Sequence, residues 1–125
     1  MIPERLLTDV EELRVQGHEI SLIEIEGFVL VTFRMVSVPR GYSKASTRLL
    51  VKAPLSFPNG APDMFWTDPD LTLPDGRSPQ SADQIEDIRG EKWRRFSWHP
   101  QKWNPGTDGL GTYLEFINSR LRQGV

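Results

Sequence analysis

Ser97 and His99 are the residues whose types and spacing best suit nucleophilic chemistry in this chain. They stand two positions apart in "RFSWHPQKWNPGTDGL", residues 95–110. On an extended backbone, side chains two apart share a face, so the imidazole can orient or deprotonate the hydroxyl. A helical backbone would separate them by about 200° instead. The competing interpretation is structural: His99 bonds a backbone carbonyl, while Trp98 and Trp103 fill the edge of the core.

A helix is predicted directly after this pair, and its first turn adds a second possible element of a site. Thr107 or Asp108 is well suited to cap that helix. Because the free amides at a helix N-terminus bind anions, they can hold a carbonyl oxygen or the carboxylate tail of a partner. The loop before Ser97 would admit such a tail.

The absence of cysteine limits the available chemistry. It excludes disulfides, thiolate metal sites and thioesters, so a covalent mechanism must use an oxygen or nitrogen nucleophile. His18 and His99 are far apart and lack clustered carboxylates, so we expect no metal. Glycines near the last helix lack the preceding strand and the lysine of a phosphate-binding loop, and we expect no cofactor.

Length and composition indicate one globular domain, residues 1–125. The chain is 38% hydrophobic and 26% charged, with a net charge of −2. That charge provides no basic field for nucleic acid or an anionic membrane, so neither is an expected partner. No apolar run reaches the length of a membrane span, and the first residues lack the layout of a secretion signal. A cytoplasmic location is therefore expected.

Hydrophobic periodicity predicts an N-terminal helix and then a sheet. Residues 3–16 carry an apolar face at helical spacing, formed by Leu6, Leu7, Val10 and Leu13. Alternating and β-branched residues then predict strands over residues 20–25, 28–38, 47–52 and 64–66. Because short turns join these strands, we expect an antiparallel meander.

The remaining chain is predicted to be a long loop and a second helix. Residues 67–95 are rich in turn formers and charge, so we expect an irregular segment, with at most a helical turn over Gln84–Ile88. The last helix carries an apolar stripe of Leu110, Leu114, Ile117 and Leu121. The order predicts an α+β fold in which an N-terminal helix, a four-strand meander, a long active-site loop and a C-terminal helix follow one another.

This order and two segments resemble the ubiquitin-conjugating enzyme superfamily. "VKAPLSFPNGAPDMFW", residues 51–66, is similar to that family's strand, proline-rich turn and aromatic strand. "WNPGTDGL" is similar to its Trp-Ser-Pro turn, with Asn104 in place of the serine. The aromatic, serine and histidine of "WRRFSWHPQKWNPGTDGLGTYL" resemble the bacterial branch called prokaryotic ubiquitin-conjugating-like family E.

The chain departs from the classical pattern of that superfamily at its reactive positions. The classical cysteine lies eight residues before the turn tryptophan, which here corresponds to Arg95. Asp68-Pro69-Asp70 stands where the classical His-Pro-Asn supplies an asparagine for the oxyanion, and a carboxylate there would repel a developing oxyanion. We expect Ser97 to be the nucleophile with His99 as its base. Ser78 is the alternative nucleophile, because the segment Pro74-Asp75-Gly76-Arg77 before it resembles the family's Asn-Gly-Arg sequence. Pro-Asp-Gly is also a common turn sequence, and a plain turn is the competing interpretation.

Two functions are compatible with the resemblance. In the first, a bacterial conjugation factor accepts the activated C-terminus of a ubiquitin-like protein from its activating enzyme as an oxyester on Ser97, and passes it to an amine. In the second, a non-catalytic module of the same fold binds the ubiquitin-like protein or the activating enzyme. The resemblance also implies a role in antiphage defence. Contacts to the partner's tail are expected from Arg95, Trp98, Trp103, Asn104 and Asp108.

Overall fold

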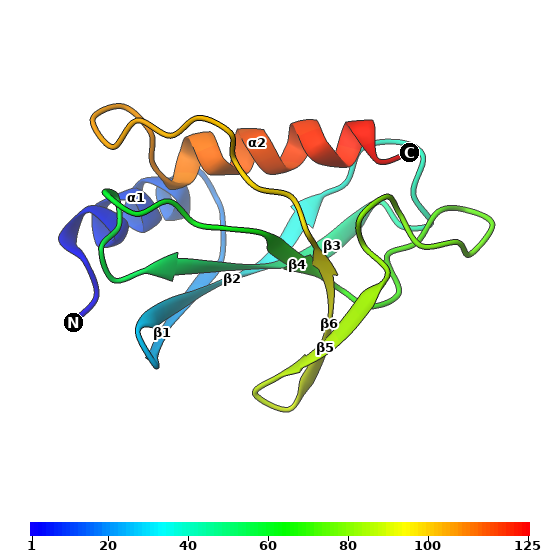
Figure 1. Cartoon of the computed structure of the whole chain (residues 1–125), viewed down its shortest axis with the longest axis horizontal. Coiled ribbons are helices and arrows are strands. Elements are labelled where there is room, and N and C mark those ends of the chain that lie inside the picture. Colours follow the sequence, from blue (N-terminus) through cyan, green and yellow to red (C-terminus); the bar gives the residue numbers. More distant parts are fainter.

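The chain folds into one antiparallel sheet whose inner face is covered by two helices (Figure 1). The computed structural model describes all residues, 1–125. The helices are α1 (Glu4–Val15) and α2 (Leu110–Gln123). The strands are β1 (Ile20–Ile25), β2 (Phe28–Ser37), β3 (Ser46–Pro54), β4 (Phe65–Thr67), β5 (Gln84–Ile88) and β6 (Glu91–Phe96). The α+β prediction is confirmed, but the sheet has six strands in the order β1-β2-β3-β4-β6-β5 rather than four.

The two additional strands lie in the segment that we expected to be irregular. Gln84–Ile88 is strand β5, not a helical turn, and it pairs with β6 from Gln84↔Arg95 to Ile88↔Glu91. The connecting Arg89-Gly90 turn has φ angles of 53° and 83°. Two residues with positive φ form the turn whose twist matches that of a hairpin, and Glu26-Gly27 repeats this geometry between β1 and β2.

Helix α1 contacts the sheet through a narrower face than predicted. Leu6, Val10 and Leu13 are buried, whereas Leu7 is 45% exposed. The polar residue Asp9 joins the buried face because its carboxylate receives hydrogen bonds from Arg5 Nε (2.9 Å) and from the backbone of the other helix. The two helices are thus connected by a buried polar contact as well as by apolar packing.

The start of helix α2 differs from the prediction in its capping residue. Gly109 occupies the N-cap position instead of Thr107 or Asp108. The Leu110 amide donates to Asp9 Oδ2 at 3.0 Å, so a residue 101 positions away in the sequence satisfies the first turn. A Cβ atom at Gly109 would lie 2.5 Å from Asp9 Oδ2, so the close approach of the helices requires glycine here.

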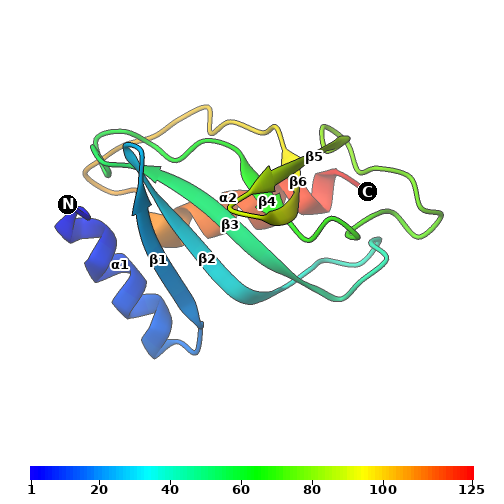
Figure 2. The ribbon, with the colours of Figure 1, turned by 90° about the horizontal axis from the view of Figure 1, so that it is seen from below.

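The main core lies between the helices and the sheet. On α2 it includes Tyr113, while Leu114 of the predicted stripe is only half-buried. A smaller cluster of Leu30, Leu50, Trp66 and Trp93 lies on the opposite face of the sheet, which Figure 2 views. Lys52 and Arg48 cover the rings of Trp66 and Trp93 at 4.6 and 4.1 Å from the ring centroids. Neither helix combines the length and apolar character needed to span a membrane.

Candidate functional site

Strand β6 delivers Ser97 and His99 to the edge of the helical layer. After Phe96, the chain leaves the sheet and runs back along α2 to the start of that helix (Figure 1). The Ser97 amide donates to Ser81 O at 2.9 Å, and the Met64 amide donates to Trp98 O at 3.1 Å. These two bonds fix residues 97–98 between the loop before β5 and the segment that leads into β4.

His99 forms a close pair with Asp63, a residue that the sequence analysis did not select. Its Nδ1 atom hydrogen-bonds Asp63 Oδ1, and both side chains are exposed, at 62% and 55%. A carboxylate on Nδ1 fixes the orientation and tautomer of an imidazole and leaves Nε2 free to accept a proton. The arrangement therefore has the carboxylate–imidazole half of a catalytic triad.

Ser97 is half-buried, and its hydroxyl oxygen accepts a hydrogen bond from Arg95 rather than bonding His99. Arg95 Nε donates to Ser97 Oγ at 3.2 Å, and Arg95 Nη1 pairs with Glu86 Oε2 at 3.1 Å. No hydrogen bond joins Ser97 to His99. Ser97 and His99 thus lie in one short segment without contacting each other. The Arg95 guanidinium lies where it can stabilise negative charge on the Ser97 oxygen.

Ser78, the alternative nucleophile, belongs to a different environment. It is exposed, and its Oγ accepts a hydrogen bond from Arg94 Nη1 at 3.1 Å. Arg94 is 7% exposed and also donates to the carbonyls of Pro69 and Ala82. Burial lowers the pKa of Arg94, although Asp70 and Asp83 oppose this effect. No histidine or carboxylate hydrogen-bonds the Ser78 hydroxyl, so nothing there resembles an activating base.

The other predicted contact residues shape a turn beside α2. Trp103 Nε1 donates to Pro58 O at 2.7 Å, and the Asn104 amide donates to Asp108 Oδ2 at 2.7 Å. Trp98 lies under Arg120 of α2, whose Cζ is 4.8 Å from the ring centroid. The turn and α2 enclose a groove of about 250 Å³ whose lining includes Lys102, Trp103, Asp108, Tyr113 and Arg120.

Two amides at the start of α2 already have partners within the chain. The Leu110 amide is already bound to Asp9, and the Gly109 amide donates to Thr112 Oγ1 at 3.0 Å. Asp9 thus provides a carboxylate to the first turn of α2 from within the chain. The groove beside the helix includes Asp108 and Thr112 of this helix start in its lining.

The model of prokaryotic E2 family E matches residues 6–124. The chain belongs to prokaryotic E2 family E. Searches of curated proteins and of solved structures gave no match. Membership connects this chain to the conjugation of ubiquitin-like proteins, and so to a ubiquitin-like protein and an activating enzyme as the general kind of partner.

Both carboxylates of the Asp68-Pro69-Asp70 segment lie next to basic side chains. Asp70, which stands at the position of the family's asparagine, is 73% exposed and pairs with Lys44 at 3.0 Å. Asp68, at the position of the family's histidine, is more buried. It pairs with Arg48 and Lys44, and it also accepts the Arg48 amide at 3.1 Å. Burial acts to raise the pKa of Asp68, but the hydrogen bonds from Arg48 and Lys44 outweigh it and hold the pKa below its usual value. The Asp68 carboxylate therefore stays charged. It connects the loop after β4 to Arg48 of β3 and to Lys44 just before that strand.

Tyr113 is the second residue that the sequence analysis missed at this E2-family site. Its hydroxyl donates to Met64 O at 2.5 Å from the middle of the α2 core face. Burial, together with the nearby charge of Asp63, raises the pKa of Tyr113 far above its usual value. For Asp63, the sequence offered one signal, which is a carboxylate placed directly before the predicted strand 64–66. The sequence alone could not show that this carboxylate pairs with His99, 36 positions away.

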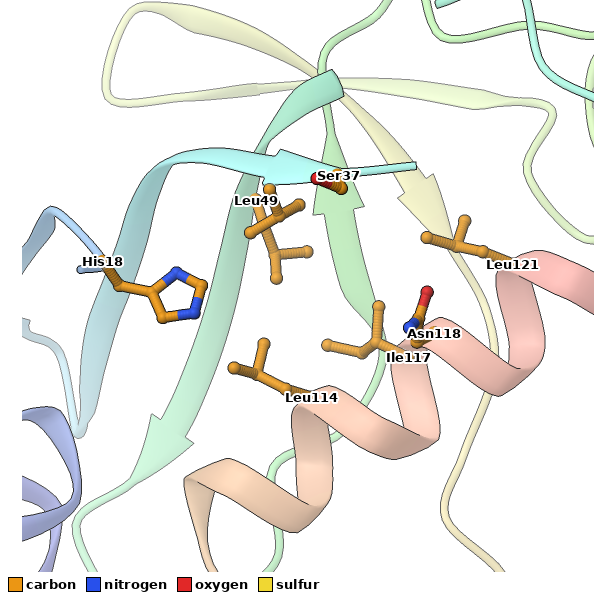
Figure 3. A pocket seen from close by; sticks show the side chains of 8 residues that line it. His18, Ser37, Leu49, Leu114, Ile117, Asn118 and Leu121 are labelled. Atoms are coloured by element: carbon orange, nitrogen blue, oxygen red, sulfur yellow. The ribbon is translucent and has the colours of Figure 1, made fainter. Parts of the chain in front are cut away.

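A second cavity of this E2-family fold, about 270 Å³, lies on the inner face between α2 and strands β2 and β3 (Figure 3). Its lining combines the apolar side chains of Leu49, Leu114, Ile117 and Leu121 with the polar side chains of His18, Ser37 and Asn118, and the His18 imidazole points into it. None of its lining residues belongs to the 95–109 segment. The cavity is thus separate from the candidate chemistry around Ser97 and His99.

Proposed function

We propose that this protein carries the activated C-terminus of a ubiquitin-like protein as an oxyester on Ser97 and transfers it to an amine. The observation that supports this proposal most is the Asp63–His99 pair, which lies two residues from a half-exposed serine at the end of β6. In a chain without cysteine, an oriented imidazole is the kind of group that a serine nucleophile needs.

The first step forms the carrier ester. Ser97 Oγ attacks the carbonyl carbon of the activated C-terminus, a new C–O bond forms, and the bond to the activating enzyme's leaving group breaks. His99 Nε2 accepts the hydroxyl proton and returns it to the leaving group, while Asp63 stabilises the imidazolium. Ser97 and His99 must approach each other when the partner binds, as catalytic groups often do only in the assembled complex.

The second step transfers the carried group. An amine attacks the ester carbonyl, a C–N bond forms, and the C–O bond to Ser97 breaks. The amine loses a proton, and Ser97 Oγ regains one, with His99 as the relay. An oxyester is a poorer acyl donor to amines than a thioester, so the donor from Arg95 to the serine oxygen matters for the charge that develops there.

A non-catalytic partner-binding module is the second candidate function. One observation favours it: the hydrogen bond of Ser97 Oγ is made with Arg95, which is itself paired with Glu86, and not with His99. In that case the 250 Å³ groove beside α2 and the turn around Trp103 would be contact surfaces for the partner.

A transfer assay with two serine variants separates these functions. The protein is mixed with ATP, an activating enzyme and a ubiquitin-like protein, and adducts are resolved by intact mass. We expect a hydroxide-labile adduct that Ser97→Ala abolishes and Ser78→Ala retains. A binding module would give a non-covalent complex and no adduct. An adduct that persists in Ser97→Ala would exclude Ser97 as the carrier.

A further inference from the structure

Met64 connects the core of the protein to the Asp63–His99 pair through an unusual backbone conformation. Its φ angle is +60°, a left-handed value that is uncommon and strained for a residue with a side chain. Asp63 directly precedes it in the sequence. The direction in which the Asp63 side chain leaves the backbone therefore depends on how the chain is held at Met64.

Two hydrogen bonds hold Met64 in that conformation. Its amide donates to Trp98 O at 3.1 Å, and its carbonyl accepts from Tyr113 Oη at 2.5 Å. The Tyr113 side chain is 1% exposed and lies in the main core, against the rings of Trp103 and Phe116. A hydroxyl fixed by core packing thus determines the position of the Met64 carbonyl.

We propose that Tyr113 is a positioning residue: through Met64, it directs the Asp63 carboxylate toward His99. Neither Tyr113 nor Met64 touches the reacting atoms in this account. The Trp98 carbonyl bonds the Met64 amide and adjoins His99, so the same link fixes both members of the pair. Any effect of the Tyr113–Met64 hydrogen bond on acyl transfer rests on the proposed function. Its effect on the geometry of the Asp63–His99 pair does not.

The link has a spectroscopic consequence for His99. When Asp63 accepts a hydrogen bond from Nδ1–H, the neutral imidazole is held in the tautomer that leaves Nε2 as an acceptor. If the Met64 carbonyl is released, Asp63 is no longer directed at the ring. We then expect the Nδ1–H tautomer to lose its dominance and the Nε2–H tautomer to appear.

The test uses the protein alone and measures the ¹⁵N shifts of its imidazoles at a pH where both are neutral. Tyr113→Phe removes the hydroxyl but keeps the packed ring, and we expect it to mix the tautomers of His99. Tyr42→Phe is the matched control, because Tyr42 Oη makes an equivalent buried bond to Leu121 O at 2.6 Å, away from the pair. His18 is an internal reference whose signals should stay unchanged.

Met64→Val provides a second route to the same result. A β-branched side chain is strongly disfavoured at positive φ, so this variant disturbs the link from the backbone side. A shift of the His99 tautomers in Tyr113→Phe and Met64→Val, but not in Tyr42→Phe, supports the proposal. The proposal would be overturned if the ¹⁵N chemical shifts of His99 in Tyr113→Phe equalled those of the wild type. It would also be overturned if Tyr42→Phe changed these chemical shifts as much as Tyr113→Phe does. If Tyr113→Phe does not fold, Met64→Val decides by the same criterion. The outcome is independent of whether Ser97 forms an ester.

Discussion

His99→Ala is expected to slow the acylation of Ser97 by about 10²–10⁴-fold, the usual contribution of a positioned general base. Asp63→Asn should cause a smaller loss, because it keeps the shape of the side chain but removes the charge that stabilises the imidazolium. The double variant should be about as slow as His99→Ala alone, since the two residues act on one proton.

Single-turnover kinetics with a labelled peptide thioester as acyl donor measure this effect without the activating enzyme. His18→Gln is the matched control, because His18 packs edge-on against Phe33 and makes no contact with the site. Its rate should equal that of the wild type. A His99→Ala protein that is acylated at the wild-type rate would show that the Asp63–His99 pair has no part in the chemistry.

Arg94→Met is expected to lower the free energy of unfolding by about 3 kcal/mol. Methionine keeps an unbranched apolar stem but leaves the carbonyls of Pro69 and Ala82 without the donor that Arg94 supplies. Buried acceptors that lose a charged donor typically cost about 1.5–3 kcal/mol each, with partial recovery from water. The loop between β4 and β5 depends on these bonds, so its amides should also lose protection from hydrogen exchange.

Denaturant unfolding monitored by tryptophan fluorescence measures the change, and Arg122→Met is the control. Arg122 is exposed on α2 and forms no ion pair, so its replacement should change the free energy of unfolding by less than about 0.5 kcal/mol. Equal stability of the Arg94→Met and wild-type proteins would show that the loop after β4 does not depend on the buried guanidinium.

The elements with strong hydrophobic periodicity were predictable from the sequence. Helix α1, the β1–β4 meander and helix α2 lie within a few residues of their predicted bounds, because each buries one regular face. The β5–β6 hairpin was not predicted, since "QIEDI" is short, charged and mostly exposed. Its strand conformation comes from pairing with β6 and from the Arg89-Gly90 turn, and neither signal is visible in periodicity.

The candidate site was only partly predictable for a related reason. Ser97 and His99 could be selected because they are neighbours in the sequence. Asp63 lies 36 positions from His99, and Asp9 lies 101 positions from the helix start that it caps. Contacts across such distances depend on how the elements pack, so local patterns assigned the cap to the wrong residue and left the carboxylate partner of His99 unassigned.

The most direct measurement of the central claim exchanges the atom that carries the acyl group. Ser97→Cys replaces only oxygen by sulfur, so the adduct formed with the activating enzyme and ubiquitin-like protein should change from an ester to a thioester. We predict that the wild-type adduct resists dithiothreitol and is cleaved by hydroxide, while the Ser97→Cys adduct is released by dithiothreitol. A variant adduct that still resists dithiothreitol, or a wild-type protein that forms no adduct under the same conditions, would contradict the account.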